Sequence, residues 1–354
     1  MGTLRAGLIG LGMMGRHHAR VLGSLEGVEL VAVADPGGDV HGVAAGRALF
    51  TSVEDLLGQD LDYCVVAVPT ALHEPVGLAL AAAGVHALIE KPLAQDAASS
   101  QRLVDAFEAA GLIGAVGHIE RYNPALQQAR ARIEAGELGR VYQVATRRQG
   151  PFPARIADVG VVKDLATHDI DLTAWVTQQP YRRIAANTAF RSGRQHEDLV
   201  AATGLLADGT VTNHLVNWLS PLKERVTTIT GEKGAFVADT LTADLTFFAN
   251  GSVPVTRPEI AQFRGVTEGD ITRYAIAKPE ALRVEHEQFR DAILGKDADI
   301  VTLRQGHNTV LVAEAITLSA ELAGGLPMES LLTREPSRSS TVRSQEVIDI
   351  CMTH

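Results

Sequence analysis

The first residues of the chain combine a short apolar run, a glycine-rich turn and a helix-compatible segment. The run Leu4–Ile9 has the length of a buried parallel strand and leads directly into Gly10-Leu11-Gly12-Met13-Met14-Gly15. In a turn of this spacing Gly10 allows a tight bend, Gly12 lets the backbone approach a pyrophosphate, and Gly15 lets the next helix pack close to the strand. The free N–H groups at the start of that helix would bind phosphate oxygens.

A second apolar run, Val28–Ala34, ends in Asp35, twenty residues after Gly15. A carboxylate at this position hydrogen-bonds ribose hydroxyls and leaves no room for a 2′-phosphate, so the pattern favours NAD over NADP. The alternative is that the glycine-rich turn only joins a strand to a helix and that Asp35-Pro36 is an ordinary turn. Strand, turn, helix, strand and acid in this order favour dinucleotide binding.

Strands and helices continue to alternate after Asp35, which predicts a doubly wound parallel sheet from Leu4 to about Gly117. Such sheets bind ligands at the carboxyl ends of their strands. The expected strands are Leu61–Val68, Val85–Ile89 and Leu112–Val116, and the helix-compatible segments are Val40–Ala48, Ser52–Leu57, His73–Ala83 and Ala97–Ala110. The predicted cofactor-contacting residues are Gly10, Gly12, Met13, Met14, Gly15, Asp35, Pro69, Thr70, His73, Glu90 and Lys91.

The pattern changes after this region to alternating strands joined by short turns, which predicts a mostly antiparallel sheet with helices on one face. We expect an NAD-binding Rossmann domain over 1–118, an α+β substrate and oligomerisation domain over 119–333, and a tail over 334–354. The open face of such a sheet predicts a homo-oligomer. Expected helices are Pro124–Gly136, Lys163–Val176, Leu282–Leu294 and Leu303–Ala323, and expected strands include Arg140–Arg148, Ile184–Phe190, Leu199–Leu206, Thr210–Asn217, Arg225–Thr230, Gly234–Asp239 and Ala243–Phe248.

Bulk properties narrow the class of protein. A chain of 354 residues accommodates two domains, and its net charge of −10 argues against nucleic acid as a partner. The two cysteines, Cys64 and Cys351, are far apart and predict no disulfide framework; Cys64 lies in an apolar strand and is expected to be a buried thiol. We see no signal peptide and no apolar run long enough for a membrane span, so we expect a cytoplasmic protein.

Lys91 is the first candidate for chemistry, because it follows a strand of the sheet directly and precedes Pro92. A cis Lys91-Pro92 bond is an open alternative for the backbone here. A lysine at this edge would hydrogen-bond a substrate hydroxyl and stabilise the alkoxide as hydride leaves. The alternative is a surface lysine paired with Glu90.

Asp164 and His168 are the second candidate, because four residues on a helix place them on one face. A carboxylate beside an imidazole fixes its tautomer and raises its basicity, which suits a general base. The alternatives are a helix-surface pair or half of a metal site. No second His or Cys stands at ligand spacing, so we expect no metal.

The segment Glu120–Pro124, at the expected domain junction, is the third candidate. Arg121 would hold an anion and Asn123 a sugar hydroxyl, whereas the alternative is a structural hinge before a helix that begins at Pro124. Arg147, Arg148 and Arg155 would add positive charge at the mouth of the cleft, or lie at a solvated strand end.

Taken together, these motifs resemble the Gfo/Idh/MocA oxidoreductase family over nearly the whole chain. The resemblance runs from the Gly10–Gly15 turn through Glu90-Lys91-Pro92 to Asp164-Leu165-Ala166-Thr167-His168. It implies that Lys91, Asp164 and His168 are the catalytic set, that hydride passes between a sugar or cyclitol carbinol and NAD, and that the second domain forms dimers or tetramers.

Within the family, the segments 117–124 and 160–171 are similar to those of UDP-N-acetylglucosamine 3-dehydrogenases. We therefore expect oxidation of the 3-hydroxyl of this or a related UDP-sugar. The alternatives are a dehydrogenase of myo-inositol, glucose or a similar polyol, and a non-catalytic dinucleotide-binding sensor. The predicted substrate-contacting residues are Lys91, Arg121, Tyr122, Asn123, Lys163, Asp164 and His168.

Overall fold

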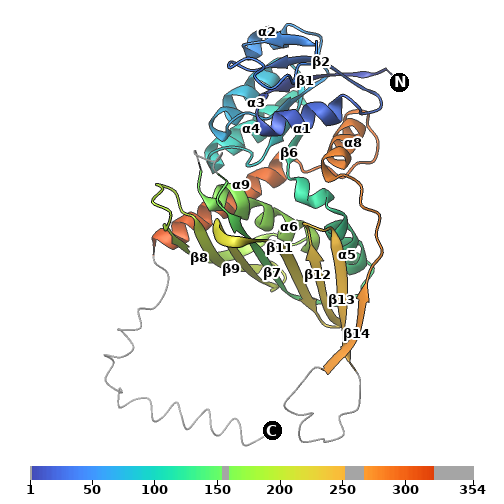
Figure 1. Ribbon diagram of the computed structural model, residues 1–354, viewed down its shortest axis with the longest axis vertical. Helices are drawn as coiled ribbons and strands as arrows, with labels where there is room; N and C mark the ends of the chain where they lie inside the picture. The colour runs from blue at the N-terminus through green and yellow to red at the C-terminus, as the bar shows by residue number, and fades with distance from the viewer. Residues whose placement is uncertain (1, 154–158, 252–266, 323–354) are drawn as a thin grey trace, which may run out of the picture. The chain divides into compact units, whose positions relative to one another are not determined.

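The structure is a computed structural model that describes residues 2–153, 159–251 and 267–322. The helices pack on two sheets, one of six strands and one of eight, and the six-stranded sheet lies above the other in Figure 1. The expected fold class is confirmed, because the first sheet is parallel and the second is mostly antiparallel. Among the described residues no helix has the length and apolar character needed to cross a bilayer.

The first sheet has the strand order β3-β2-β1-β4-β5-β6, and every neighbouring pair is parallel. The order changes direction beside β1, and a doubly wound sheet binds its ligands at that point. The strands are β1 Leu4–Ile9, β2 Val28–Ala34, β3 Ala48–Phe50, β4 Tyr63–Val66, β5 His86–Glu90 and β6 Gly114–Gly117, and the helices between them are α1 Met13–Leu22, α2 Val53–Leu57, α3 His73–Ala82 and α4 Ala97–Ala110, with a 3₁₀ turn, η1, over Thr70–Leu72.

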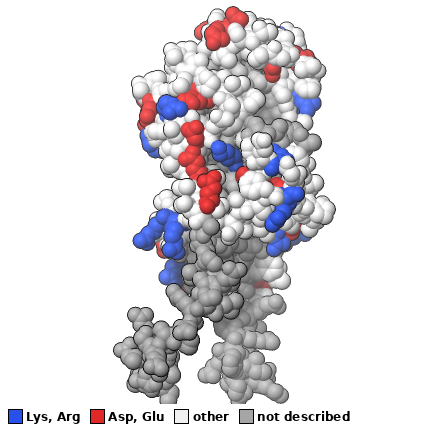
Figure 2. Space-filling view, turned by 90° about the vertical axis from the view of Figure 1, so that its left-hand side faces the viewer, with Lys and Arg blue, Asp and Glu red and all other residues white. Residues whose placement is uncertain are grey.

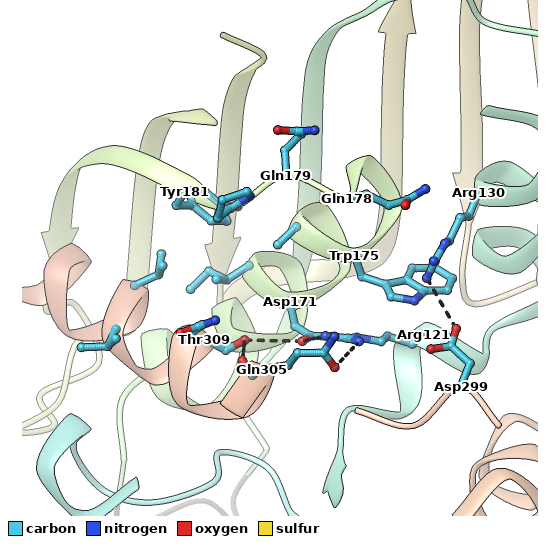
Figure 3. A pocket seen from close by; sticks show the side chains of 16 residues that line it. Arg121, Arg130, Asp171, Trp175, Gln178, Gln179, Tyr181, Asp299, Gln305 and Thr309 are labelled. Atoms are coloured by element: carbon cyan, nitrogen blue, oxygen red, sulfur yellow. Dashed lines mark hydrogen bonds and ion pairs between the residues drawn. The ribbon is translucent and has the colours of Figure 1, made fainter. Parts of the chain in front are cut away.

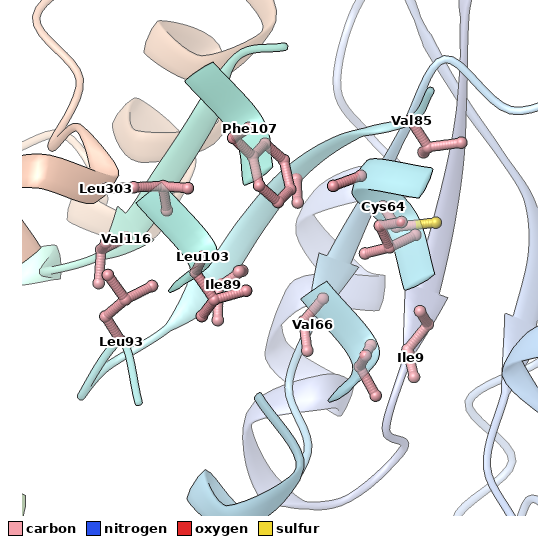
Figure 4. Packing of buried hydrophobic residues seen from close by; sticks show 14 of the residues in the cluster. Ile9, Cys64, Val66, Val85, Ile89, Leu93, Leu103, Phe107, Val116 and Leu303 are labelled. Atoms are coloured by element: carbon pink, nitrogen blue, oxygen red, sulfur yellow. The ribbon is translucent and has the colours of Figure 1, made fainter. Parts of the chain in front are cut away.

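Apolar side chains pack on both faces of this sheet, since successive residues of a strand point to opposite sides. Figure 4 shows one of the two layers, in which Cys64 and Val66 of β4 meet Leu103 and Phe107 of α4. On the other face Val65 belongs to a second layer. The expected buried thiol is confirmed, and burial raises the pKa of Cys64 to about 12. Cys351 lies outside the described residues.

The second sheet has the order β14-β13-β12-β11-β7-β10-β9-β8, and its neighbours are antiparallel except for β7 and β10. Helices α5, α6 and α9 cover one face of it (Figure 1). The strands are β7 Val141–Pro151, β8 Tyr181–Ala189, β9 Leu199–Leu206, β10 Val211–Asn217, β11 Leu219–Gly231, β12 Gly234–Asp239, β13 Asp244–Gly251 and β14 Thr267–Arg273, and the helices are α5 Pro124–Glu134, α6 Thr167–Thr177, α8 Ala281–Ile293 and α9 Leu303–Glu321, with a 3₁₀ turn, η2, over Ile119–Tyr122 and a π-helical turn, η3, over Val162–Ala166.

The other face of the second sheet is more open. Along β10 the side chains alternate, so that Thr212, His214 and Val216 are buried while Val211 and Leu215 are exposed. On the face drawn in Figure 2, Lys and Arg residues are interspersed with Asp and Glu and form no broad basic surface over the described residues.

After β14 the chain returns to the first sheet. Helix α8 packs beside α1 (Figure 1), and its Phe289 meets Tyr63 of β4 edge to face, with ring centroids 5.5 Å apart. Val116 of β6 donates its N–H to the carbonyl oxygen of Val301. Residues of the expected second domain therefore complete the first. The boundaries at 118 and 333 stay a prediction, and the tail 334–354 lies outside the described residues.

Most expected elements are found within a few residues of their predicted limits, but two expectations were wrong. Residues 40–47 form turns instead of a helix and Ala48 begins β3, because Gly42, Ala45 and Gly46 adopt positive φ angles that end any helix. The helix expected over Lys163–Val176 begins with the π-turn, and becomes α-helical only at Thr167. Strands β3 and β14 were not anticipated.

Candidate active site

The glycine-rich turn has the geometry expected of a phosphate-binding loop. Gly10 has φ +92°, and a Cβ there would lie 2.4 Å from the carbonyl oxygen of Ala67. A Cβ on Gly15 would lie 2.0 Å from the carbonyl oxygen of Gly10, so both positions require glycine. Above Gly12 a Cβ would meet nothing within 4 Å, and α1 starts there without a side-chain cap. The start of α1 is thus open to an anion.

Asp35 lies at the end of β2 and is held against this loop. Its Oδ2 accepts the N–H of Leu11 and its Oδ1 accepts the N–H of Gly37, both at 2.8 Å. Met13 is exposed beside the loop. The open helix start and the acid at the end of the neighbouring strand fit a dinucleotide whose phosphates lie at α1 and whose ribose hydroxyls reach Asp35.

Thr70 and His73 follow β4 on the same edge of the sheet, but His73 is buried and has protein partners. Its Nδ1 lies 2.8 Å from the carbonyl oxygen of Pro92, and its Nε2 lies 3.0 Å from that of Val68. His73 therefore ties the segment after β4 to the segment after β5. Contacts of Pro69, Thr70 and His73 with a cofactor stay a prediction.

Lys91 lies at the carboxyl end of β5, and the Lys91-Pro92 bond is cis. Its Nζ donates to Oδ1 of Asp164 at 2.9 Å and to the carbonyl oxygen of Asp164 at 2.8 Å. The Lys91 side chain is 16% exposed, and the Asp164 side chain 8%. The ammonium group is therefore held by η3 while the Lys91 side chain stays partly exposed.

The π-turn places Asp164 so that its carboxylate contacts Lys91. The sequence predicted a bond between Asp164 and His168; in the structure the partner is Lys91, 73 residues away in the chain. Nδ1 of His168 has no hydrogen-bond partner among the residues that the structure describes. The His168 ring faces that of His118 at right angles, with centroids 6.5 Å apart.

His168 is held in a positively charged surrounding. Burial first, and then the charges of Lys91 and Arg148, hold the pKa of His168 well below its ordinary value. The ring is therefore neutral at pH 7. A neutral imidazole with an unpartnered nitrogen can accept a proton from a substrate hydroxyl.

Arg148 is buried, which neither sequence alternative anticipated. Its Nε donates to Asp169 at 2.8 Å and its Nη1 to Glu120 at 2.9 Å. Arg148 therefore joins β7 to α6 and η2 behind His168. Arg147 is exposed and pairs with Glu224, and Arg155 lies outside the described residues.

The segment Glu120–Pro124 has the contacts of a structural hinge. Arg121 is 5% exposed and donates from Nε and Nη2 to both carboxylate oxygens of Asp171, at 2.7 and 2.6 Å. The Tyr122 hydroxyl donates to the carbonyl oxygen of Asp299, and Asn123 caps α5 by accepting the N–H of Ala125. Their assignment as substrate ligands stays a prediction that these contacts do not favour.

A cavity of about 560 Å³ lies between α6 and α9, and the Arg121–Asp171 pair forms part of its wall (Figure 3). Neither Lys91 nor His168 lines it. Both cations in its wall are paired, Arg121 with Asp171 and Arg130 with Glu134 and Asp299. Lys163 is the last of the predicted substrate-contacting residues, and its Nζ donates to the carbonyl oxygen of Gln95 at 2.7 Å.

Four buried polar residues beside Lys91 were not found from the sequence. They are His18 of α1, His118 after β6, and Glu285 and His286 of α8. His18 carried a usable signal, because it stands three residues after Gly15 and four before Leu22, on the helix face that must pack on the sheet. Among the described residues there is no group of three His, Cys, Asp or Glu side chains that could hold a metal ion.

Comparisons with known proteins match both parts of the chain to family models. Residues 4–118 match the oxidoreductase family with an NAD-binding Rossmann fold, named GFO_IDH_MocA, and residues 126–237 match the GFO/IDH/MocA C-terminal domain. Together the two matches cover more than half of the chain.

Among curated relatives, UDP-N-acetylglucosamine 3-dehydrogenase of Acidithiobacillus ferrooxidans is 31% identical over 82% of this chain and 88% of its own length. Its solved structure has a TM-score of 0.79, covering 91% of this chain and 99% of that one at 28% identity. The WlbA dehydrogenase of Bordetella pertussis, solved with NADH and UDP-GlcNAcA, has a TM-score of 0.74 at 26% identity, covering 92% and 99% of the two chains.

A different substrate class is represented by inositol 2-dehydrogenase 4 of Saccharopolyspora erythraea. It is 35% identical, but over 49% of this chain and 54% of its own length. The glycine-rich turn, the open helix start, Asp35 and the family match over residues 4–118 agree on the first domain, which is an NAD-binding Rossmann fold. The chain belongs to the Gfo/Idh/MocA family of oxidoreductases.

Proposed function

We propose that this protein oxidises a secondary hydroxyl group of a sugar to a ketone by hydride transfer to NAD, and that the hydroxyl is the 3-hydroxyl of UDP-N-acetylglucosamine or a related UDP-sugar. The observation that carries the chemistry is the contact of Lys91 Nζ with Asp164 at 2.9 Å, beside the neutral ring of His168, at the ligand-binding edge of an NAD-binding sheet. The near full-length similarity to a UDP-N-acetylglucosamine 3-dehydrogenase supports the substrate.

Each residue of the site has its own role in the proposed reaction. NAD, when bound, accepts the hydride from the carbinol carbon as its C–H bond breaks. Lys91 donates a hydrogen bond to the substrate oxygen and stabilises the negative charge that develops there. His168 takes the hydroxyl proton on a ring nitrogen as the C=O bond forms, and Asp164 keeps the Lys91 ammonium in place. In the alternative assignment Lys91 is the base.

A single-turnover experiment tests this function. Enzyme at stoichiometric concentration is mixed with NAD and either UDP-N-acetylglucosamine or myo-inositol, and NADH absorbance is followed while the sugar product is analysed. A burst with the UDP-sugar and a 3-keto product supports the proposal. A burst with myo-inositol alone keeps the chemistry and discards the nucleotide-sugar substrate. No burst with any sugar of a wider panel favours a dinucleotide-binding sensor.

Replacing His168 with Ala should separate binding from chemistry. We expect turnover to fall roughly 10²–10⁴-fold, as for the loss of a general base. The affinity for NADH, measured by fluorescence titration, should change by less than about threefold. Unchanged turnover would remove His168 from the mechanism and leave Lys91 as the base.

We also propose that copies of the chain associate through the open face of the second sheet as homodimers or homotetramers. The outward apolar residues of β10, Val211 and Leu215, support this. Light scattering of the Val211→Lys/Leu215→Lys variant should show a smaller particle than the wild type. An identical mass for both would contradict this interface. The cytoplasmic location stays a prediction.

A further inference from the structure

A line of buried hydrogen bonds runs from helix α8 to the backbone of Lys91. Nε2 of His286 lies 2.8 Å from Nδ1 of His18, and Nε2 of His18 lies 2.9 Å from Oε1 of Glu90. The other oxygen of Glu90, Oε2, accepts the N–H of Lys91 at 3.1 Å. The line joins three elements that are far apart in the sequence: α8, α1 and the end of β5.

All three side chains of this line are removed from solvent. His18 is 0%, His286 1% and Glu90 8% exposed. Figure 1 shows α8 lying beside α1, so the two histidines meet across a helix-helix contact. A buried carboxylate without hydrogen-bond donors would be strongly disfavoured. The hydrogen bond between His18 and Glu90 therefore stabilises the Glu90 carboxylate in this buried position.

The direction of the bonds follows from the charge of Glu90. Burial opposes ionisation, but the hydrogen bond and charge of His18 and the charge of Lys91 win, so the pKa of Glu90 lies below its ordinary value. An ionised carboxylate only accepts, and therefore Nε2 of His18 donates to it. The other ring nitrogen of His18, Nδ1, is engaged with Nε2 of His286.

Two neighbours of Glu90 do not compete for this bond. Burial, and then the charge of Glu90, raise the pKa of Glu285 well above its ordinary value, which disfavours a second carboxylate beside Glu90. Burial, and then the charge of His18, lower the pKa of His286 well below its ordinary value, so His286 is neutral. The His118 ring also lies near Glu90, and burial lowers its pKa.

We propose that His18 and His286 are positioning residues for Lys91: His286 holds the ring of His18, His18 orients the Glu90 carboxylate, and Glu90 holds the peptide N–H of Lys91. The line also links Lys91 to α1, whose first turn forms the phosphate-binding loop. This role rests on the proposed function, in which Lys91 contacts the substrate oxygen. Removing the His286 ring nitrogen leaves the His18 ring free to turn away from Glu90, and the backbone at Lys91 is then free to shift.

The test compares a donor with a non-donor at position 286. His286→Met fills similar volume and donates nothing, whereas His286→Gln places an amide N–H where Nε2 was. We expect His286→Met to lower kcat by about 10²-fold, the effect of a catalytic group misplaced by about 1 Å, with KM for NAD changed less than about threefold. His286→Gln should restore kcat to within about fivefold of wild type.

His307→Leu is the matched control. It removes a histidine hydrogen bond of the same 2.8 Å length, to the Ser100 hydroxyl, away from Glu90. We expect its kcat to stay within about twofold of wild type even where its Tm falls. Equal losses of kcat in His286→Met and His286→Gln would show a packing role and overturn the proposal, as would an unchanged kcat in His286→Met. If His286→Met does not fold, His286→Leu replaces it in the same comparison.

A readout without substrate separates this proposal from the proposed function. Ring ¹⁵N shifts of histidine-labelled protein report the hydrogen bonding at both nitrogens of His18. We expect the same His18 shifts in the wild type and in His286→Gln, and changed shifts at both nitrogens in His286→Met. If no sugar is oxidised but this pattern is seen, the hydrogen-bond line stands and the reaction must be revised. An unchanged Nε2 shift of His18 in all three proteins overturns the role of His286.

Discussion

Two cation–carboxylate pairs, Lys91–Asp164 and Arg121–Asp171, connect η3 and α6 to other parts of the molecule, and they differ in how the cation is held. Lys91 reaches Asp164 through a single nitrogen at 2.9 Å, and 16% of its side chain is exposed. Arg121 binds both oxygens of Asp171, and 6% of its side chain is exposed. The lysine can exchange its partner for a substrate oxygen, whereas the bidentate arginine pair has no free position to offer.

The comparison shows that a charged residue close to the proposed substrate site is not necessarily a substrate ligand. Arg121 and Asp171 line the cavity of Figure 3, and Oδ2 of Asp171 lies 4.0 Å from Nδ1 of His118. Lys91 is held by Asp164 alone, through its carboxylate and its main-chain carbonyl oxygen. We therefore expect the loss of the arginine to appear in stability and the loss of the lysine to appear in turnover.

The largest expected effect is that of Arg121→Met. It leaves the buried Asp171 unpaired, which should lower the free energy of unfolding by about 3–5 kcal/mol. Urea unfolding measures this. The double variant Arg121→Met/Asp171→Leu should recover much of the loss, because no buried charge remains. A stable single variant with a strongly raised KM for the sugar would instead make Arg121 a substrate ligand.

The next effect is that of Lys91→Met, which should lower kcat about 10²–10³-fold, or about 3–4 kcal/mol of transition-state stabilisation. The free energy of unfolding should fall less than in Arg121→Met, since the Lys91–Asp164 pair is more exposed than the Arg121–Asp171 pair. Steady-state kinetics and urea unfolding on the same preparation measure both. A loss of stability as large as that of Arg121→Met would erase the distinction between the two pairs.

The sequence predicted the parts of this arrangement that depend on neighbours in the chain. Gly10 and Gly15 are set by local backbone geometry, and Asp35 and Lys91 follow from where buried strands end. The partner of Asp164 could not be predicted in this way. Within the helix pattern His168 is the near candidate, and only the π-turn and the approach of two domains give the carboxylate to Lys91.

The buried charges behind the site were missed for the same reason. Arg148 alternates with exposed residues along β7, and its burial depends on Asp169 and Glu120, which reach it from other elements. Likewise, Val40–Ala48 has helix-compatible residues, but Gly42 and Gly46 favour turns. The structure at such positions depends on contacts between residues that are far apart in the chain, and a single sequence does not show these contacts.

Acid pH distinguishes the Arg121–Asp171 pair from the buried histidines, because the pair should stay ionised at pH values at which buried histidines become protonated. Although burial acts against it, the charges of His118 and Arg121 lower the pKa of Asp171, so that pair stays ionised. Burial lowers the pKa of His214 to about 4. The unfolded state, with a histidine pKa near 6.5, therefore binds more protons between pH 6.5 and pH 4.

The free energy of unfolding should consequently fall as the pH is lowered through this range, by about 3 kcal/mol from His214 alone. His214 is buried between the hydroxyl groups of Thr146 and Tyr181. Urea unfolding of wild type and His214→Gln at pH 7 and pH 4.5 tests this: the variant should show the smaller drop. An equal drop in both would assign the acid sensitivity to the other buried histidines.

The smallest effect should be that of Asn123→Ala, and it decides between two roles for the hinge. Asn123 caps α5 through its bond from Ala125 N–H at 3.0 Å and donates to the carbonyl oxygen of Thr240 at 3.0 Å. Loss of such a cap lowers the free energy of unfolding by about 1 kcal/mol. With both of its polar atoms engaged, Asn123 has little to offer a sugar hydroxyl, so KM for the sugar should stay within about twofold. Asn123→Asp keeps the capping oxygen and should restore most of the stability. A tenfold rise in KM without loss of stability would instead place Asn123 in the substrate site, and would require the hinge to open when the sugar binds.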